Sequence, residues 1–227
     1  MGKKKDSEMT LKEQLKKEEK AYVLQTHIVE TPTGKKCITV PVFIDKTELD
    51  PCCGKIPIKK QKVLTSDRII LKNIEDKDQK GMIEIVKDPL VKKTYMLPDL
   101  NNEQEEKVYF NRLKNLTLSD EHYSYGIYLK DKVVGFINDV VVDNDEIEVG
   151  FFINPKYWNQ GITSEALNIM IKELFRVGFN RVVAGHFVEN PASGRVMQKC
   201  GMKLIDKEED IVYRGAIHHV LYYTIEK

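Results

Sequence analysis

The most regular pattern of apolar and polar positions in the chain lies between residues 164 and 178. Its apolar positions recur at i, i+3, i+4, i+7 and i+8, and they are Leu167, Met170, Ile171, Leu174 and Phe175. This spacing is typical of an amphipathic helix with one face packed against a core. Gly178 marks its end, because helices favour glycine directly after their last residue. The pattern therefore predicts a helix that begins at Ser164.

Runs of β-branched and aromatic residues on either side of this helix predict strands at 146–153 and 181–187. A strand, a helix and a second strand in succession form a unit in which the two strands lie parallel. The other predicted strands are 68–72, 125–129, 133–136, 140–142, 211–213 and 220–225, and the other predicted helices are 76–86, 103–116 and 191–200. The fold class is therefore an α/β mixed sheet, antiparallel in its first half, with helices on its faces.

The first 64 residues follow a different pattern. A thin apolar stripe predicts a helix over 9–24. A β-branched run at 36–43 predicts a strand, which Pro41 restricts to a sheet edge. We therefore assign 1–64 to an N-terminal extension of unknown function, made of a helix and an edge strand, and 65–227 to the main domain.

Charge separates the same two parts, although the whole chain carries a formal net charge of only +1. Residues 1–64 hold 14 Lys, no Arg and 9 acidic residues, so the extension is basic and the rest mildly acidic. A basic arm can contact a polyanion such as RNA. Mixed signs without arginine or interleaved aromatics are instead typical of a solvated surface. Nucleic acid is therefore not expected as a partner.

Composition narrows the class of protein. At 41% hydrophobic and 31% charged, the chain can bury a sizeable core, which excludes wholesale disorder. No apolar run reaches the length of about 20 residues that a membrane helix needs, and the first residues do not form a secretory signal. The four cysteines include no CxxC pair. We expect a cytoplasmic protein, a monomer or homodimer, with no metal and no membrane partner.

The segment 148–166 carries the candidate chemistry, because it joins a strand to the start of the long helix through a short loop. A helix N-terminus offers unpaired N–H groups and the positive end of its dipole to a phosphate. Gly161 lets such an anion approach the backbone closely. On these residues alone, an ordinary strand–helix connection with one turn glycine remains the alternative.

Taken together, Trp158-x-x-Gly161-x-Thr163 and the Ser164-Glu165-Ala166 that follows resemble the acetyl-CoA pyrophosphate loop of the GNAT N-acetyltransferases. The closest branch is that of the ribosomal-protein N-terminal acetyltransferases. Segments 66–71, 134–137 and 190–202 resemble other parts of that branch, so the resemblance covers about 66–227. It implies the GNAT fold, with a mostly antiparallel sheet, one parallel pair and helices on both faces.

The chain departs from the family pattern at four positions, one of them Trp158, which stands where an Arg or Gln usually begins the loop. Asn159 replaces a common glycine, and Thr163 stands where the family prefers Gly or Ala. Met197 occupies the place of a tyrosine that protonates the leaving thiolate in many members, so that role must pass to another group or to water.

The resemblance assigns the following residues to acetyl-CoA: Phe151, Phe152, Ile153, Trp158, Asn159, Gln160, Gly161, Ile162, Thr163, Ser164, Asn190 and Ser193. It also implies that a backbone N–H near Phe152 stabilises the oxyanion.

The predicted catalytic residues are Glu148, Ser193 and Tyr222. Strand alternation places Glu148 on the face opposite the core, so that it can point into the cleft, where a carboxylate can deprotonate an amine through a water. Ser193 is the predicted proton donor to the thiolate, and the phenol of Tyr222 or of its neighbour can reach the cleft. The alternatives are an exposed strand-end carboxylate, a first-turn helix serine and an ordinary sheet tyrosine.

The sequence thus predicts an N-acetyltransferase that moves the acetyl group of acetyl-CoA to a primary amine by direct attack in a ternary complex. The acceptor is a protein N-terminus or a small amine. Five acidic residues at 88–106 favour a cationic acceptor, unless they form a solvated face; they are Asp88, Asp99, Glu103, Glu105 and Glu106. The alternative is a non-catalytic acyl-CoA-binding module that docks on RNA or protein through the basic arm.

Overall fold

The computed structural model describes residues 20–31, 34–45 and 59–227, with side chains from residue 59 onward. The chain forms two compact units, residues 1–56 and 57–227. In the first unit, β1 (Lys20–Thr31) and β2 (Gly34–Asp45) pair antiparallel from Lys20↔Asp45 to Thr31↔Gly34. In this two-stranded sheet each strand has an open edge, so a proline in β2 is tolerated.

This hairpin corrects the helix predicted over 9–24. Residues 20–24 begin β1, while residues 9–19 lie outside the described part of the chain. The apolar stripe ran past residue 20 into a segment rich in β-branched residues, which favours a strand when a partner strand is available. The strand predicted at 36–43 is confirmed within β2.

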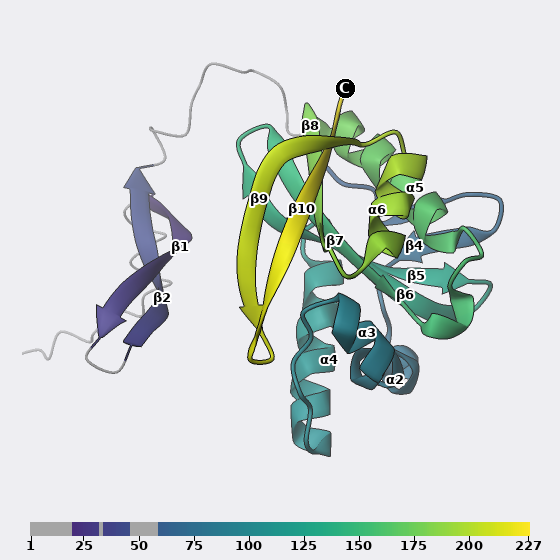
Figure 1. The fold of residues 1–227 in the computed structure, drawn as a ribbon, viewed down its shortest axis with the longest axis horizontal. Helices are drawn as coiled ribbons and strands as arrows, with labels where there is room; N and C mark the ends of the chain where they lie inside the picture. The colour runs from purple at the N-terminus through teal and green to yellow at the C-terminus, as the bar shows by residue number, and fades with distance from the viewer. Residues whose placement is uncertain (1–19, 32–33, 46–58) are drawn as a thin grey trace, which may run out of the picture. The chain divides into compact units, whose positions relative to one another are not determined.

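The second unit is built on an eight-stranded sheet in the order β3-β4-β5-β6-β7-β8-β10-β9 (Figure 1). The strands are β3 (Val63–Thr65), β4 (Ile69–Lys72), β5 (Tyr125–Leu129), β6 (Lys132–Asp143), β7 (Glu146–Ile153), β8 (Arg181–Phe187), β9 (Lys203–Tyr213) and β10 (Ala216–Glu226). Each adjacent pair of this sheet is antiparallel except β7 and β8, which are parallel. The predicted mixed sheet with one parallel pair is confirmed.

Helices cover both faces of this sheet (Figure 1). Their bounds are η2 (Asp76–Asp78), α2 (Gln79–Lys87), α3 (Pro89–Thr94), α4 (Glu103–Leu118), η3 (Pro155–Tyr157), α5 (Ile162–Val177) and α6 (Pro191–Lys199). The apolar stripe of α5 packs with the sheet in one core cluster, and α2 to α4 pack against the other face in a second. Gly178 caps α5 as predicted, although the helix begins two residues before Ser164.

Two predicted strands, at 133–136 and 140–142, are one continuous strand, β6. The polar pair Asn138 and Asp139 interrupts the apolar run and therefore suggested a break. In the structure a bulge next to Asp139 absorbs the irregularity. The Asp139 carboxylate is satisfied by the Ser124 hydroxyl at 3.0 Å and by the His122 ring at 2.8 Å.

The second unit also begins earlier than the predicted boundary at residue 65. Buried Lys60 donates from Nζ to the carbonyl oxygens of Thr117 (3.2 Å) and His122 (2.6 Å). The Gln61 N–H donates to the Glu173 carboxylate at 2.6 Å, and Leu64 of β3 is 5% exposed. A three-residue strand has too few positions to show a period, so β3 had no detectable signal.

Within the described residues, no helix is both long and apolar enough to cross a membrane.

The boundary at residue 57 predicts the result of two truncations. Removal of residues 1–56 should leave the Tm of the second unit within about 2 °C, whereas removal of 1–64 should lower it by at least about 5 °C. The second cut deletes β3 and the Lys60 contacts, and a lost buried Leu alone costs about 2–5 kcal/mol. Thermal unfolding followed by circular dichroism measures both; equal Tm values would place the boundary back at 65.

Candidate active site

The parallel pairing of β7 with β8 covers three residue pairs, Glu146↔Arg181 to Glu148↔Val183. From Val149 to Ile153, β7 is in register with β6 alone. The two strands therefore separate beyond Glu148, and β7 keeps an open edge toward β8.

The open edge of β7 presents backbone N–H groups. Next to the strand, Asn154 N–H donates to the carbonyl of Val134 at 2.8 Å. Because hydrogen-bonded pairs alternate along an antiparallel ladder, the N–H of Phe152 also faces β6. The N–H groups of Phe151 and Ile153 then face the gap. The predicted donor near Phe152 is thus one of its two neighbours.

A cleft of about 460 Å³ lies at this separation, lined by the end of β7, the loop before α5, the first turn of α6 and part of α3. Ten predicted cofactor residues line it: Phe151, Phe152, Ile153, Trp158, Asn159, Gly161, Thr163, Ser164, Asn190 and Ser193. The structure therefore brings the predicted loop, strand end and helix start together.

Two predicted cofactor residues do not line the cleft. The Gln160 side chain donates back to the carbonyl of Lys156 at 2.9 Å, and Ile162 is 2% exposed within the core. Ile162 can therefore offer a ligand only its backbone, while the exposed Gln160 side chain is turned back onto its own loop.

The loop before α5 adopts left-handed conformations at Asn159 (φ 58°) and Gly161 (φ 77°). Asparagine is among the few residues with a side chain that enter this region readily. Asn159 therefore takes the conformation for which glycine is the usual choice. Trp158 ties the loop to the end of β7, because its Nε1 donates to the carbonyl of Ile153 at 3.1 Å.

The N-terminus of α5 opens into the cleft without a capping side chain. Its N-cap is Gly161, so no capping side chain accepts a hydrogen bond from the N–H groups of Ile162, Thr163 and Ser164. By contrast, Asn102 caps α4 and Asn190 caps α6. An uncapped helix start with a positive dipole end is a site for an anion.

Glu165, in the first turn of α5, is engaged elsewhere. Its carboxylate accepts hydrogen bonds from the Ser66 hydroxyl and from Arg68 Nε at 2.7 Å. Burial alone would raise the pKa of Glu165, but these hydrogen bonds hold it below its ordinary value. Arg68 also donates to the carbonyl of Gln160 at 3.1 Å, which fixes the loop from outside the cleft.

Asn190 and Ser193 form a small hydrogen-bonded unit at the start of α6. Asn190 is 9% exposed, and its amide donates to the Ser193 Oγ at 2.9 Å while its Oδ1 accepts from the Ser193 N–H at 3.4 Å. Because the Ser193 oxygen accepts from Asn190, its own hydroxyl proton remains available to another acceptor.

Glu148 lies on the face of β7 opposite the buried side chains of Ile147 and Val149, as strand alternation predicted. It does not line the cleft itself. Burial raises the pKa of Glu148, and nearby Glu209 and Glu146 raise it further, while Lys207 opposes them. Carboxylates from β7 and β9 therefore gather on this face.

Tyr222 also lies outside the cleft lining. Its hydroxyl donates to the Glu209 carboxylate at 2.7 Å, and its pKa is raised by burial and by that hydrogen bond. Tyr223 points to the other face, where Gln198 donates to its hydroxyl at 3.3 Å. Of the two neighbouring phenols, Tyr222 is the one on the same side as Glu148.

Several lining residues were not predicted. Arg195 and Lys199, four residues apart on α6, bring positive charge to the cleft; this i, i+4 basic pair beside the loop was a detectable signal. Val91 and Thr94 of α3 also line it, but no motif distinguishes them.

The acidic residues at 88–106 are largely engaged in local contacts. Asp88 caps α3 through the Leu90 N–H, and Asp99 pairs with Arg214 at 2.5 Å. Glu106 pairs with Lys87, and Glu105 accepts from Asn101. These four carboxylates are therefore not free to bind an amine acceptor. The acidic residues at 88–106 do not support a cationic acceptor, which agrees with the alternative that they form a solvated face.

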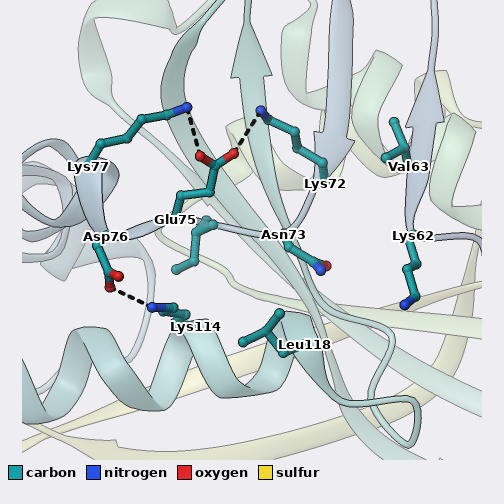
Figure 2. Close-up of a pocket in the computed structure, with 10 residues that line it drawn as sticks. Lys62, Val63, Lys72, Asn73, Glu75, Asp76, Lys77, Lys114 and Leu118 are labelled. Carbon is teal, nitrogen blue, oxygen red and sulfur yellow. Dashed lines mark hydrogen bonds and ion pairs between the residues drawn. The ribbon is translucent and has the colours of Figure 1, made fainter.

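A second hollow, of about 670 Å³, lies between β3, β4 and α4 (Figure 2). Lys72 and Lys77 both bind Glu75, and Lys114 binds Asp76 at 2.5 Å. Most of its positive charge is thus neutralised locally, and none of the predicted site residues lines it. Among residues with described side chains, no group of three or more His, Cys, Asp or Glu could hold a metal ion.

Comparison with known proteins decides the family. Residues 68–203 match the family described as the acetyltransferase (GNAT) domain. The chain belongs to the GNAT acetyltransferase family. It is an N-acetyltransferase of this family.

Relatives and solved structures agree with this membership. The uncharacterized N-acetyltransferase YnaD of Bacillus subtilis is 28% identical over 144 residues, which cover 62% of this chain and 82% of YnaD. A GNAT-family acetyltransferase from Bacillus anthracis superposes with a TM-score of 0.63 at 25% identity, covering 72% and 98% of the two chains. RimL, a ribosomal L7/L12 α-N-protein acetyltransferase solved with coenzyme A, shares the fold at 18% identity, with a TM-score of 0.63 and coverage of 72% and 97%.

The left-handed loop predicts the effect of Gly161→Ala. An alanine at φ 77° costs about 1–2 kcal/mol of folding free energy, and its Cβ would meet Arg68 at an ordinary 3.5 Å. Backbone strain is therefore the cause of the loss. Urea denaturation measures it, with Asn159→Gly as the matched control, which we expect to change stability by less than about 0.5 kcal/mol. An unaltered Gly161→Ala midpoint would contradict the strained conformation.

Proposed function

We propose that the protein transfers the acetyl group of acetyl-CoA to a primary amine, by direct attack of the amine on the thioester in a ternary complex. The observation that carries the proposal is the uncapped N-terminus of α5, which opens into a cleft lined by the end of β7 beyond its pairing with β8 and by the start of α6. Family membership supports the same reaction class.

The cleft accounts for the parts of acetyl-CoA. The pyrophosphate would lie on the N–H groups of Ile162, Thr163 and Ser164, with Arg195 and Lys199 adding positive charge. The pantetheine would follow the open edge of β7 and pair with it like an added strand. RimL, which was solved with coenzyme A, is built on the same fold.

The acetyl transfer would use groups on both sides of β7. Glu148 takes a proton from the amine through a water, and the neutral nitrogen attacks the thioester carbonyl carbon. The N–H of Phe151 or Ile153 stabilises the oxyanion. When the intermediate collapses, the C–S bond breaks, the Ser193 hydroxyl donates its proton to the thiolate, and the serine oxygen regains, through solvent, the proton that the nitrogen loses as it becomes the amide. Met197, which is buried in the core, carries a thioether with no proton to give, so it cannot replace this donor.

The acceptor side supports a cationic amine. Glu209 lies close enough to Glu148 for its charge to add to the burial that raises the pKa of Glu148, and Tyr222 fixes Glu209 by a hydrogen bond. An ammonium group approaching this face would be attracted by these carboxylates. Both a protein N-terminus and a small polyamine meet this requirement, so a panel of acceptors is the appropriate assay.

The first test is Glu148→Gln, which should lower kcat by about 10²–10⁴-fold, the usual contribution of a general base. Acetyl-CoA affinity, measured by calorimetry, should not change, because Glu148 does not line the cleft. Release of coenzyme A thiol is followed with Ser- and Ala-starting hexapeptides, spermidine and an aminoglycoside.

The matched control is Glu146→Gln, on the same strand and face, whose carboxylate pairs with Arg181 at 3.2 Å; it should keep most of the activity. If the wild type binds acetyl-CoA yet acetylates none of these amines, the non-catalytic module becomes the better description.

The raised pKa of Glu148 also predicts a pH dependence. The base is active only when ionised, so kcat/KM should be lost as the pH falls through the Glu148 pKa, which lies above the ordinary 4.5. This loss of kcat/KM at low pH should disappear in Glu148→Gln, whereas the part of the pH profile that reflects deprotonation of the amine itself should remain. If kcat/KM falls at the same low pH in the wild type and in Glu148→Gln, another group is the base.

A further inference from the structure

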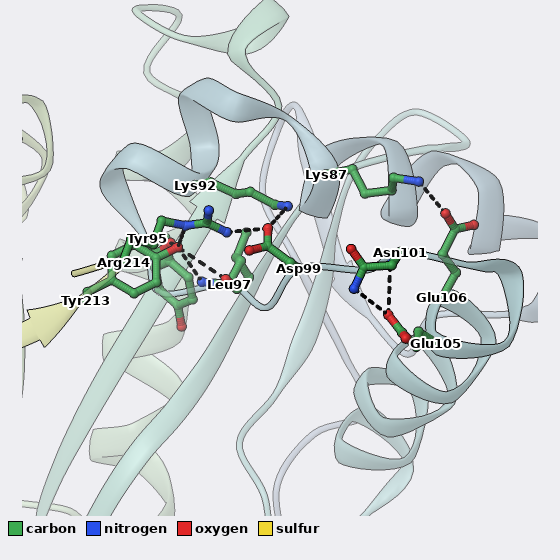
Figure 3. A network of polar contacts seen from close by, with 10 residues as sticks. All are labelled: Lys87, Lys92, Tyr95, Leu97, Asp99, Asn101, Glu105, Glu106, Tyr213 and Arg214. Carbon is green, nitrogen blue, oxygen red and sulfur yellow. Dashed lines mark hydrogen bonds and ion pairs between the residues drawn. The ribbon is translucent and has the colours of Figure 1, made fainter.

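The turn between β9 and β10 reaches across to the segment that follows α3, although the two lie about 115 residues apart in sequence (Figure 3). The Tyr213 hydroxyl accepts from the Leu97 N–H at 3.2 Å and from Arg214 Nε at 2.9 Å. It faces the Leu97 carbonyl at 3.1 Å and the Tyr95 carbonyl at 3.3 Å, either of which can take its proton. One hydroxyl thus binds the backbone of 95–97 as donor and acceptor.

Arg214 makes the second contact between these segments. Its Nη2 lies 2.5 Å from Asp99, which also pairs with Lys92 of α3 at 2.8 Å. Arg214 (φ 52°) and Gly215 (φ 77°) both adopt left-handed conformations at the hairpin turn, which is costly for arginine. Hydrogen bonds from Arg214, which has the larger effect, and from Lys92 lower the pKa of Asp99 to about 2. Asp99 therefore stays ionised and paired across the working pH range.

The segment held in this way connects the two sides of the candidate site. Thr94 lines the cleft, while the ring of Tyr95 packs 5.1 Å from that of Phe152. The Tyr95 hydroxyl donates to Asn138 Oδ1 at 3.0 Å. A Cβ at position 150 would come within 2.6 Å of this hydroxyl, so Gly150 leaves the space in which Tyr95 crosses β7. Position 150 lies on the same face as Glu148, two residues along the strand.

We infer that Tyr213 and Arg214 are positioning residues for the acceptor: they hold segment 94–99 as a fixed wall beside Glu148, with Tyr95 as its inner surface. The inference rests on the proposed function. Neither residue lines the cofactor cleft, so both act through Tyr95 and its neighbours. Without these contacts the wall is free to leave β7, and the amine is bound less tightly while the cofactor cleft keeps its shape.

The test compares Tyr213→Phe and Arg214→Ala in the full-length chain, using the amine of the panel with the fastest wild-type turnover. Each variant should raise the acceptor KM by about 3- to 10-fold, the factor expected for a lost hydrogen bond or exposed ion pair. The kcat and the calorimetric acetyl-CoA affinity should stay within about 2-fold. Arg214→Lys, which keeps the charge, should recover part of the lost affinity.

A double-mutant cycle identifies the partner. Asp99→Asn and Arg214→Ala should each raise the acceptor KM, and the effect of the double variant should fall short of the sum of the two, because both substitutions remove the shared Arg214–Asp99 pair. Lys87→Ala is the control, since its ion pair with Glu106 joins α2 to α4 without touching 94–99 (Figure 3); its KM should not change.

Hydrogen exchange gives a reading that needs no acceptor. The Leu97 amide should exchange faster in Tyr213→Phe, while amides of α5 keep their protection.

Two results separate the inference from the proposed function. A wild-type protein that acetylates no amine overturns both. An active wild type with unchanged acceptor KM in Tyr213→Phe and Arg214→Ala overturns this inference alone, as does a joint fall in kcat and acetyl-CoA affinity, which would indicate general damage to the fold.

Discussion

The short parallel contact between β7 and β8 is the constraint on which the site depends. The crossover through α5 makes the two strands parallel, and three residue pairs hold them before they separate. Had the ladder continued, the N–H groups of Phe151 and Ile153 would be used within the sheet. The start of α5 would still carry a positive end, but it would face a closed surface. The cleft exists because one ladder stops early.

The polar groups around this opening are divided between two tasks. Glu165, Arg68 and Asp99 form contacts that fix loops from outside, and their charges are largely neutralised. Two groups are not neutralised in this way. Glu148 has a raised pKa, and the Ser193 hydroxyl still has a proton that it can donate. Most charged side chains near the site therefore hold loops in place. A count of acidic residues along 88–106 could not distinguish such carboxylates from those available for catalysis.

The sequence was most informative where many residues obey one period or one motif. The helix at 164–178 had five apolar positions in register, and the loop at 158–163 had its neighbours in family order, so both were predicted nearly to the residue. Three kinds of feature were not. β3 is too short to show a period, and the start of β1 at residue 20 was missed because the apolar stripe over 9–24 runs across it. Tyr213 meets Leu97 only because the sheet brings β9–β10 toward α3, a non-local contact without a local signature.

One residue of the loop has a consequence for spectroscopy. Trp158 is the single tryptophan among 227 residues, beside ten tyrosines. Its indole is 37% exposed and borders the cleft, and its nitrogen is bound to the end of β7. Light absorbed selectively by tryptophan therefore excites one position of the chain, at the mouth of the cleft. The protein carries a built-in fluorophore whose emission reports the polarity of this site without any attached label.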